Sequence, residues 1–420
     1  MKKTDLIKLS IGQIGNALAF MVFFLFMPTY FKNDVFIGPL ENTLSFLIIT
    51  ISFTAGAITY LFAGYLSDKT RTRWGKRRPF FLLVAPSGIA YIFLGFIFPI
   101  SQISMFIFLS LLATIYAVLY RLEYCAYWSL YMDLTAPEER VTTSITFNLF
   151  GTLGTVAALI LTPILEELLP FSIITLLVGC IFIGSVLFAF FFGPKENLPE
   201  FREELKAQNL IETLKETISD RNFFYYLLAS FFFVLGYSTS VLVLIPFLDA
   251  QSIDLLLMLP FIIPIAVLYF YFFNKLAKSR GKLHAFRFSL LIGIFTIPIT
   301  IFLGLIGTGV LLFIQIFLII AIFLFVVIAI LTFQYALLMD LSPPGREATY
   351  SGVYLFVIVI PIPIGSALVG PILDFLTFEF LIWPPETLSF ACIFLITVFF
   401  IIISYFFLRK IQMKDQSPKK

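Results

Sequence analysis

Twelve long apolar stretches, separated by short polar connections, dominate this sequence of 420 residues. A helix needs about 20 apolar residues to cross the hydrocarbon core of a membrane, and each stretch has about that length. The sequence therefore predicts twelve transmembrane helices, at about 7–32, 44–67, 80–100, 103–133, 141–165, 170–193, 222–248, 253–276, 285–307, 309–340, 347–374 and 387–409. With 60% hydrophobic and 13% charged residues, the composition excludes a water-soluble globular surface, so we expect an all-α integral membrane protein.

Charged residues are divided unequally between the two ends of the predicted helices. If the amino terminus is cytoplasmic, the cytoplasmic connections hold almost all Lys and Arg residues, including the runs Lys69–Arg78 and Lys275–Arg287. The outer connections hold one basic residue, Lys32, and several acids. Because positively charged connections remain in the cytoplasm, we expect a multi-pass protein of the cell membrane with both termini cytoplasmic. The net charge of +3 then comes from the basic residues that orient the helices in the membrane, and it does not indicate a nucleic-acid partner.

An internal repeat relates the two halves of the chain. The segment YWSLYMDLTAPEER in the first half resembles QYALLMDLSPPGRE in the second, so that Asp133 corresponds to Asp340, 207 residues later. The loop GKRR that begins at Gly75 is matched in the same way by GKLH at Gly281. Such repeats indicate two pseudo-symmetric six-helix bundles, an arrangement that exposes a site near the membrane midplane to each side in turn.

The sequence divides into four parts. Residues 1–193 and 222–409 hold the two predicted bundles, and residues 410–420 form a cytoplasmic tail. Between the bundles, residues 194–221 are rich in Glu, Lys, Arg and Asp, with apolar residues at helical spacing. This pattern is typical of an amphipathic helix on the cytoplasmic membrane surface, although a docking helix for a regulatory protein would have the same pattern.

The predicted helix 103–133 carries two charges in its interior. At 1.5 Å per residue, Arg121 and Glu123 lie roughly 15 to 18 Å from its cytoplasmic end. A charge at that depth costs roughly 2.5 to 3.5 kcal/mol, so each should face a cavity or a partner. Residues two positions apart lie on different faces of a helix, so these two should not pair with each other. The alternative to a functional site is a buried charge network that holds helices together.

Aromatic residues surround these charges along the same helix. Arg121, Tyr124 and Trp128 share one face, on which an indole ring could stack on sugar C–H groups beside hydrogen-bond donors for sugar hydroxyls. Tyr120 and Glu123 share the adjacent face. A single amide in a membrane helix more often joins helices than binds a ligand, but two amides are candidate contacts on neighbouring helices. The predicted substrate-binding residues are Trp128, Tyr124, Arg121, Tyr120, Asn16 and Asn148.

The connection after the second predicted helix reads GYLSDKTRTRWGKRRPF, from Gly64 to Phe80. Gly64 permits close approach of a neighbouring helix, and Asp68 at the helix end can accept hydrogen bonds from the N-terminus of another helix. We therefore predict a cytoplasmic gate made by Gly64, Asp68, Gly75 and Arg78. The alternative is that the basic residues only orient the helices and bind lipid headgroups.

This loop resembles the connection between helices 2 and 3 of the major facilitator superfamily. Its longer form, with T-R-x-R-W-G-K before the proline, is similar to the glycoside–pentoside–hexuronide cation symporters, and the resemblance extends from about Leu9 to Arg140. It implies the twelve-helix major facilitator fold, a sugar substrate, and a sugar contact at Trp128. The segment MDLTAPEER is also similar to plant sucrose carriers and their proton-coupled animal relatives.

The chain departs from the symporter pattern at the ion site. The resemblance aligns the family's two cation-binding Asp residues with Gly56 and Tyr60, and its sugar-binding acid with Tyr124. Neither Gly56 nor Tyr60 can bind sodium as a carboxylate does. We therefore expect a proton as the coupling ion, carried by Glu123, because burial favours the protonated form of a carboxyl group.

These features predict a secondary active transporter that moves a sugar or glycoside by alternating access. Two alternatives remain on the same fold: a transporter of an amphiphile such as a lysolipid, suggested by the 54 Phe residues, and a membrane sensor that does not transport. No paired carboxylates, Cys/His cluster or nucleophile arrangement indicates an enzyme. The three cysteines lie in apolar stretches, so we expect neither a disulfide nor a metal cluster. We expect no cofactor, and the expected partners are a small-molecule substrate, a coupling proton and membrane lipids.

Overall fold

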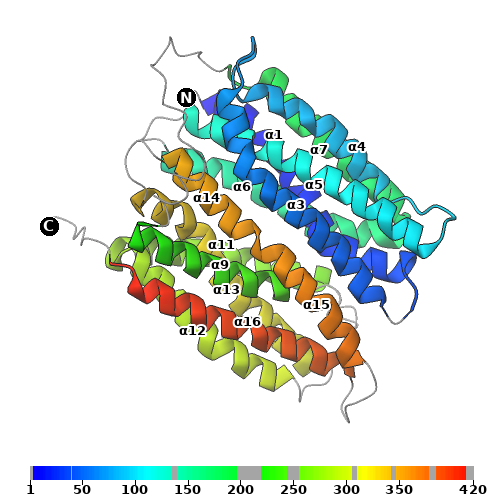
Figure 1. The fold of residues 1–420 in the computed structure, drawn as a ribbon. Helices are drawn as coiled ribbons and strands as arrows, with labels where there is room; N and C mark the ends of the chain where they lie inside the picture. The colour runs from blue at the N-terminus through cyan, green and yellow to red at the C-terminus, as the bar shows by residue number, and fades with distance from the viewer. Residues whose placement is uncertain are drawn as a thin grey trace. The chain divides into compact units, whose positions relative to one another are not determined.

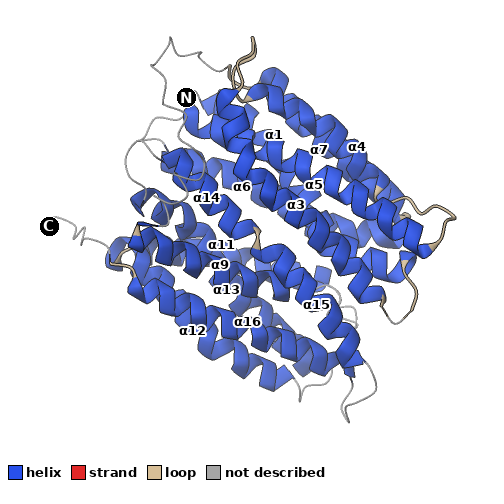
Figure 2. Ribbon diagram, viewed as in Figure 1, coloured by secondary structure: helices blue, strands red, loops and turns tan. Residues whose placement is uncertain are grey.

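The computed structural model describes residues 3–38, 40–134, 140–195, 219–243, 255–304, 310–341, 347–377 and 385–412. Regular structure in these ranges is helical, apart from one isolated bridge between Thr72 and Gly75 (Figure 2). The chain forms two compact units, Met1–Glu204 and Leu205–Lys420. Most of the predicted linker, at 196–218, and the end of the predicted tail, at 413–420, lie outside the described residues.

The first unit begins with a long helical segment whose geometry changes along its length. It comprises α1 (Lys3–Met21), the π-helical η1 (Val22–Phe26), α2 (Met27–Tyr30) and the π-helical η2 (Phe31–Val35). The remaining helices of this unit are α3 (Glu41–Lys69), the 3₁₀ helix η3 (Arg78–Leu83), α4 (Val84–Phe93), α5 (Gln102–Asp133), α6 (Arg140–Leu168) and α7 (Phe171–Phe192). Figure 1 shows them from blue to green, with α1 packed against α6 and α7, and α3 against α5.

The second unit is also helical. Its described helices are α9 (Arg221–Leu242), α11 (Leu255–Arg280), α12 (Lys282–Gly304), α13 (Val310–Leu341), α14 (Glu347–Val359), α15 (Pro361–Thr377) and α16 (Pro385–Lys410). Here α9 packs against α16 and α15, and α12 against α13. Over the described parts of both units, ten spans are long and apolar enough to cross a membrane. Each of the twelve predicted stretches overlaps a helical segment.

Two predicted helices differ from the structure. The helix expected at 80–100 begins as η3 and ends at Phe93. Directly after this end, Gly95 packs so closely that a Cβ would lie 2.9 Å from the Ser172 Cα atom, and Tyr30 donates a hydrogen bond to the Gly95 carbonyl oxygen at 3.0 Å. The Gly95 carbonyl oxygen, which the helix no longer pairs, therefore has a partner in Tyr30.

The helix expected at 347–374 is interrupted. It forms α14 and α15, which are separated at Ile360. Pro361 begins the second part, because proline lacks the N–H group that a continuous helix requires and restricts the residue before it. The first position of a helix tolerates proline, so α15 can start there.

The two units repeat the same local geometry at the loop that the repeat analysis identified. Gly75 and Gly281 both have a positive φ, +105° and +85°, a conformation that glycine adopts at little cost. In the first unit, Arg77 Nε lies 3.3 Å from the Asp133 carboxylate. In the second unit, Lys282 Nζ lies 2.8 Å from the Asp340 carboxylate. In each unit, a basic residue that follows the glycine therefore binds the corresponding acid near the end of a 32-residue helix, α5 or α13.

Candidate functional site

Arg121 lies in the interior of the first unit, enclosed by aromatic rings. Its side chain is only 6% exposed, and Nη1 donates a hydrogen bond to the Tyr60 hydroxyl at 3.0 Å. The guanidinium carbon lies 5.1 to 5.3 Å from four ring centroids, which belong to Phe20, Phe53, Tyr60 and Tyr120. Ring faces attract cations at this range, so three helices, α1, α3 and α5, together hold this charge.

Gly56 on α3 provides the space for the Arg121 side chain. A Cβ at this position would lie 3.2 Å from Arg121 Cγ and 3.6 Å from the Ala117 Cβ atom. Because Gly56 and Tyr60 are four residues apart, they lie on the same face of α3. The two positions that the resemblance aligned with cation-binding acids, Gly56 and Tyr60, therefore contact the positively charged side chain of Arg121.

Glu123 is fully enclosed, two residues further along α5. Neither of its carboxyl oxygens has a hydrogen-bond partner, and neither polar atom of the Asn16 side chain on α1 has one. The Asn16 amide is close enough to influence the Glu123 carboxyl group electrostatically, although the two do not meet in hydrogen-bonding geometry. Unpartnered polar groups are costly in an apolar interior, so this pair can accept a proton, a water molecule or a ligand group.

A row of aromatic rings runs along α5 beside these groups. Tyr116, Tyr120, Tyr124 and Trp128 follow at intervals of four residues, which places them on one helix face. Successive ring centroids are 5.6, 5.4 and 6.3 Å apart. The Tyr124 hydroxyl accepts a hydrogen bond from Gln13 Nε2 at 3.1 Å, which ties the row to α1. The row offers ring faces and hydroxyl groups next to the unpartnered amide and carboxyl groups.

The structure brings most of the predicted binding residues together. Arg121, Tyr120, Tyr124 and Trp128 lie along α5, and Asn16 faces Glu123 from α1. Asn148 is different, because its side chain is exposed on α6. The neighbouring Phe147 reaches the row instead, with its ring centroid 4.5 Å from that of Trp128.

Sequence reasoning missed the residues that enclose Arg121. Phe20 and Phe53 were not predicted, and Tyr60 was considered only as a residue that cannot bind sodium. Gln13 was not among the predicted site residues. One signal was present in the sequence: Gly56 and Tyr60 are spaced to face one neighbouring helix, as are Gln13 and Asn16 on α1.

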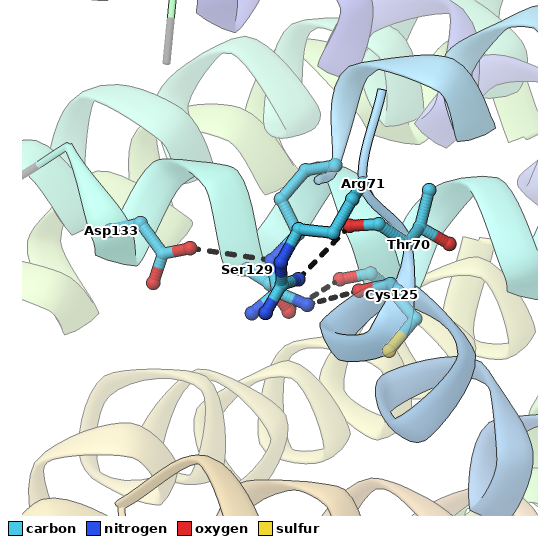
Figure 3. Close-up of polar contacts among 7 residues, drawn as sticks. Thr70, Arg71, Cys125, Ser129 and Asp133 are labelled. Atoms are coloured by element: carbon cyan, nitrogen blue, oxygen red, sulfur yellow. Dashed lines mark hydrogen bonds and ion pairs between the residues drawn. The ribbon is translucent and has the colours of Figure 1, made fainter. Parts of the chain in front are cut away.

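At the cytoplasmic end predicted for α5, the loop is joined to the helix by Arg77, which was not among the predicted gate residues. Arg77 lies 3.3 Å from Asp133 and also donates to the Ser67 hydroxyl. Figure 3 shows the Asp133 side chain pointing toward the loop that carries Thr70 and Arg71. Arg78, the predicted gate residue, is buried and donates to the Phe190 carbonyl oxygen.

For the other predicted gate residues, the structure describes the backbone but not every side-chain contact. Gly75 adopts the positive φ described above. Gly64 and Asp68 lie in the last two turns of α3, and their contacts lie outside what the structure describes. In the described ranges, no group of three or more His, Cys, Asp or Glu residues could hold a metal ion.

Comparison with known proteins relates the chain to one family. The sequence profile of the Major Facilitator Superfamily matches residues 9–366. No curated protein sequence matches the chain.

Many solved structures share the fold, among them three crystal structures of transporters. The nucleoside transporter NupG superposes with a TM-score of 0.69 and 13% identity, covering 98% of this chain and 100% of its own. A bacterial homologue of the human lysosomal transporter Spinster, inward-facing and unoccupied, superposes with a TM-score of 0.66 and 15% identity, and the match covers 97% of each chain. A bacterial homologue of the iron transporter ferroportin, outward-facing, superposes with a TM-score of 0.66 and 14% identity, and the match covers 98% of this chain and 99% of its own. These structures confirm the predicted fold class, and at such low identity they give no information on the substrate.

Proposed function

This chain belongs to the major facilitator superfamily of membrane transporters, and we propose that it moves a sugar or glycoside across the cell membrane by alternating access, coupled to a proton. Residues 1–193 and 222–409 would form the two bundles, joined by the cytoplasmic linker 194–221, with both termini in the cytoplasm. Glu123 would carry the proton. The substrate would contact Trp128 and Tyr124, together with Arg121, Tyr120, Asn16 and Asn148.

One observation carries the proton assignment. Glu123 is fully enclosed and neither carboxyl oxygen has a partner. An ionised carboxylate without a partner is strongly disfavoured in such surroundings, whereas the protonated form is neutral. A change of conformation that admits water or substrate would let the group release its proton, as coupling requires.

The sugar assignment rests on the row of rings beside these groups. Sugars present C–H faces that stack on aromatic rings and hydroxyl groups that need donors and acceptors. The row from Tyr116 to Trp128 supplies ring faces, and the unpartnered atoms of Gln13, Asn16 and Glu123 supply polar groups. The resemblance to the glycoside–pentoside–hexuronide symporters supports the same substrate class.

The gate would be formed by the loop between α3 and η3. Gly64, Asp68, Gly75 and Arg78 are its proposed residues, and the positive φ of Gly75 supports a defined turn. The matching ion pairs Arg77–Asp133 and Lys282–Asp340 support a role for this loop in both units.

Uptake by reconstituted vesicles tests the proposal. The purified chain is placed in proteoliposomes, and accumulation of labelled sugars is measured with an inward proton gradient, and again after a proton ionophore has removed it. We expect accumulation of at least one sugar that the ionophore abolishes and that replacing sodium with choline does not change. Accumulation of a labelled lysolipid in place of every sugar would support the amphiphile alternative and contradict this proposal.

A further inference from the structure

We propose that Glu123 exchanges its proton with the cytoplasm through the seam between α1 and α5, along the hydroxyl groups of Tyr127, Tyr131 and Ser10. This inference rests on the proposed function, in which Glu123 carries the coupling proton. It goes beyond that function because it assigns the route of the proton to three residues outside the proposed substrate contacts.

A second row of polar groups lies on α5 beside the row of aromatic rings. Glu123, Tyr127 and Tyr131 are spaced four residues apart, so they share one face of the helix. At 1.5 Å per residue, the two tyrosines lie about 6 and 12 Å closer than Glu123 to the end of α5 at Asp133. All three side chains of the row are buried. The row therefore leads from the enclosed carboxyl group to the end of α5 that is predicted to be cytoplasmic.

Tyr127 is the first hydroxyl of this row after Glu123. Its side chain is within electrostatic range of both the Glu123 carboxyl group and Tyr131. The Tyr127 hydroxyl donates a hydrogen bond to the Leu9 carbonyl oxygen on α1. A hydroxyl oxygen that donates one hydrogen bond still has lone pairs that accept others. Tyr127 can therefore accept a hydrogen bond from protonated Glu123 or from a water molecule between them.

Tyr131 and Ser10 form the last part of the row. Their hydroxyl oxygens lie 3.3 Å apart, and Ser10 also donates a hydrogen bond to the Leu6 carbonyl oxygen at 2.8 Å. Tyr131 lies two residues before Asp133, whose exposed carboxylate pairs with Arg77. Two residues correspond to about 3 Å along a helix. A proton that reaches this pair is therefore close to a solvent-exposed acceptor.

The seam between α1 and α5 consists mainly of side chains. The backbone of α1 packs against α6 and α7, and the backbone of α5 packs against α3 and α4. Polar side chains join α1 to α5, as where Gln13 Nε2 donates to the Tyr124 hydroxyl at 3.1 Å. Side chains change rotamer faster than whole helices move, so water can enter this seam without repacking of the two backbones.

Release of the proton is a series of single transfers. The O–H bond of the Glu123 carboxyl group breaks, and the proton goes to the Tyr127 oxygen or to a water molecule in the seam. Each hydroxyl group then accepts one proton and gives one to the next acceptor, so it ends unchanged. The Glu123 carboxylate that remains can accept a hydrogen bond from the Asn16 amide, whose Nδ2 has no other hydrogen bond. Such donors stabilise an ionised carboxylate.

The described residues on the outer side of Glu123 form no equivalent row. Tyr116 is within electrostatic range of Glu123, but its hydroxyl is enclosed and has no hydrogen bond. The same is true of the hydroxyl of Tyr91, whose ring lies against that of Tyr116. The linked hydroxyl groups therefore favour proton exchange at the end of α5 that carries Asp133.

Exchange of hydrogen for deuterium at Glu123 tests this route. The purified chain in lipid nanodiscs is transferred to D2O, and the infrared absorption of its protonated carboxyl groups is followed with time. The absorption that is lost in Glu123→Gln identifies the signal of Glu123. We expect Tyr127→Phe and Tyr131→Phe to slow the exchange about tenfold or more, because each removes one hydroxyl that would bind the proton in transit.

Two further variants make this measurement specific. Ser10→Ala and Tyr131→Phe affect the same transfer, so the double variant should be no slower than the slower single variant. The matched control is Tyr30→Phe, because the buried Tyr30 hydroxyl also donates to a backbone carbonyl, that of Gly95, but lies outside the row. We expect the control to exchange at the rate of the parent chain.

A purely structural role for the tyrosines would change the sign of the effect. If their hydroxyl groups only joined α1 to α5, removing them would loosen the seam, admit water and speed the exchange. Unchanged or faster exchange in Tyr127→Phe and Tyr131→Phe, with folding checked by size-exclusion chromatography, would overturn the inference. Slower exchange in Tyr116→Phe than in Tyr127→Phe would place the route on the outer side and would also overturn it.

The measurement needs no substrate, so it is independent of the uptake assay. Slowed exchange in the hydroxyl variants, without proton-driven uptake of any sugar, would support the route and contradict the proposed function. Proton-driven uptake together with normal exchange in these variants would overturn the route and leave the proposed function standing. If Glu123→Gln removed no carboxyl absorption at any pH, both the route and the proton assignment would be wrong.

Discussion

Replacing Glu123 with glutamine separates coupling from binding. The amide has the shape of the carboxyl group, and neither Glu123 oxygen has a hydrogen bond to lose. The variant should therefore fold and bind substrate. It cannot release a proton, so uptake driven by a proton gradient should stop, while exchange of labelled for unlabelled substrate continues.

The size of the effect follows from Glu123, the one buried acid that the structure describes at this site. One proton moving with each substrate contributes about 1.4 kcal/mol per pH unit, which is a factor of ten in concentration. With a gradient of two pH units and no membrane potential, the parent chain should accumulate substrate about 100-fold. Glu123→Gln should reach equal concentrations on both sides. A time course of labelled uptake in proteoliposomes measures both values.

Two control variants make this test specific. Glu167→Gln changes an exposed acid near the end of α6, and Asp374→Asn changes the other buried acid in the described ranges, 6% exposed on α15. Both should retain accumulation close to 100-fold. If Glu123→Gln accumulates substrate normally while Asp374→Asn does not, the coupling role of Glu123 is wrong.

Four further substitutions test the rest of the reasoning. Trp128→Ala removes a ring of the stacking row and should weaken substrate binding about 2- to 12-fold, from about 0.5 to 1.5 kcal/mol, without changing the dependence on pH; loss of coupling would contradict this. Asp68→Asn should slow transport with binding nearly intact, and equal loss of both would indicate misfolding. Gly15→Ala places a Cβ 2.8 Å from the Phe182 Cα atom and should destabilise the chain by roughly 1 to 3 kcal/mol. Gly184→Ala, where a Cβ meets nothing within 4 Å, should not lower the temperature of thermal unfolding, because alanine favours a helix more than glycine does.

The helices were predictable because the membrane imposes one length on all of them. Their interruptions were less predictable, because they depend on tertiary partners. The end of α4 is one example, since the hydrogen bond from Tyr30 to the Gly95 carbonyl joins segments 65 residues apart in sequence. The break at Pro361 had a local cause, but proline also occurs inside intact helices of this chain, such as Pro163 in α6.

The charged residues of the site were predictable, because a charge inside a membrane is energetically costly. Arg121 and Glu123 stand out in an apolar helix, and the structure encloses both. Phe20 and Phe53, which enclose Arg121, could not be singled out among 54 Phe residues, because apolar residues fit any buried position. Asn16 and Asn148 met the same polar criterion, but the structure buries Asn16 and exposes Asn148. This difference was not predictable, because one sequence does not give the register of α6 against α1.

The two units share the loop but not the chemistry of the helix interior. Gly75 and Gly281 both have a positive φ, and the acids near the ends of α5 and α13 each pair with a basic residue one or two positions after that glycine. At the same offset of 207 residues, however, Arg121 and Glu123 correspond to Ile328 and Ile330, both buried and apolar. Because the loop geometry occurs in both units, we expect the loop to have the same role in each. The buried charges Arg121 and Glu123, by contrast, occur in the first unit and are absent at the corresponding positions of the second. We therefore expect the proposed substrate and proton chemistry to depend on the first unit, and we expect replacement of Ile328 or Ile330 by another apolar residue of similar size to leave proton-driven uptake in proteoliposomes unchanged.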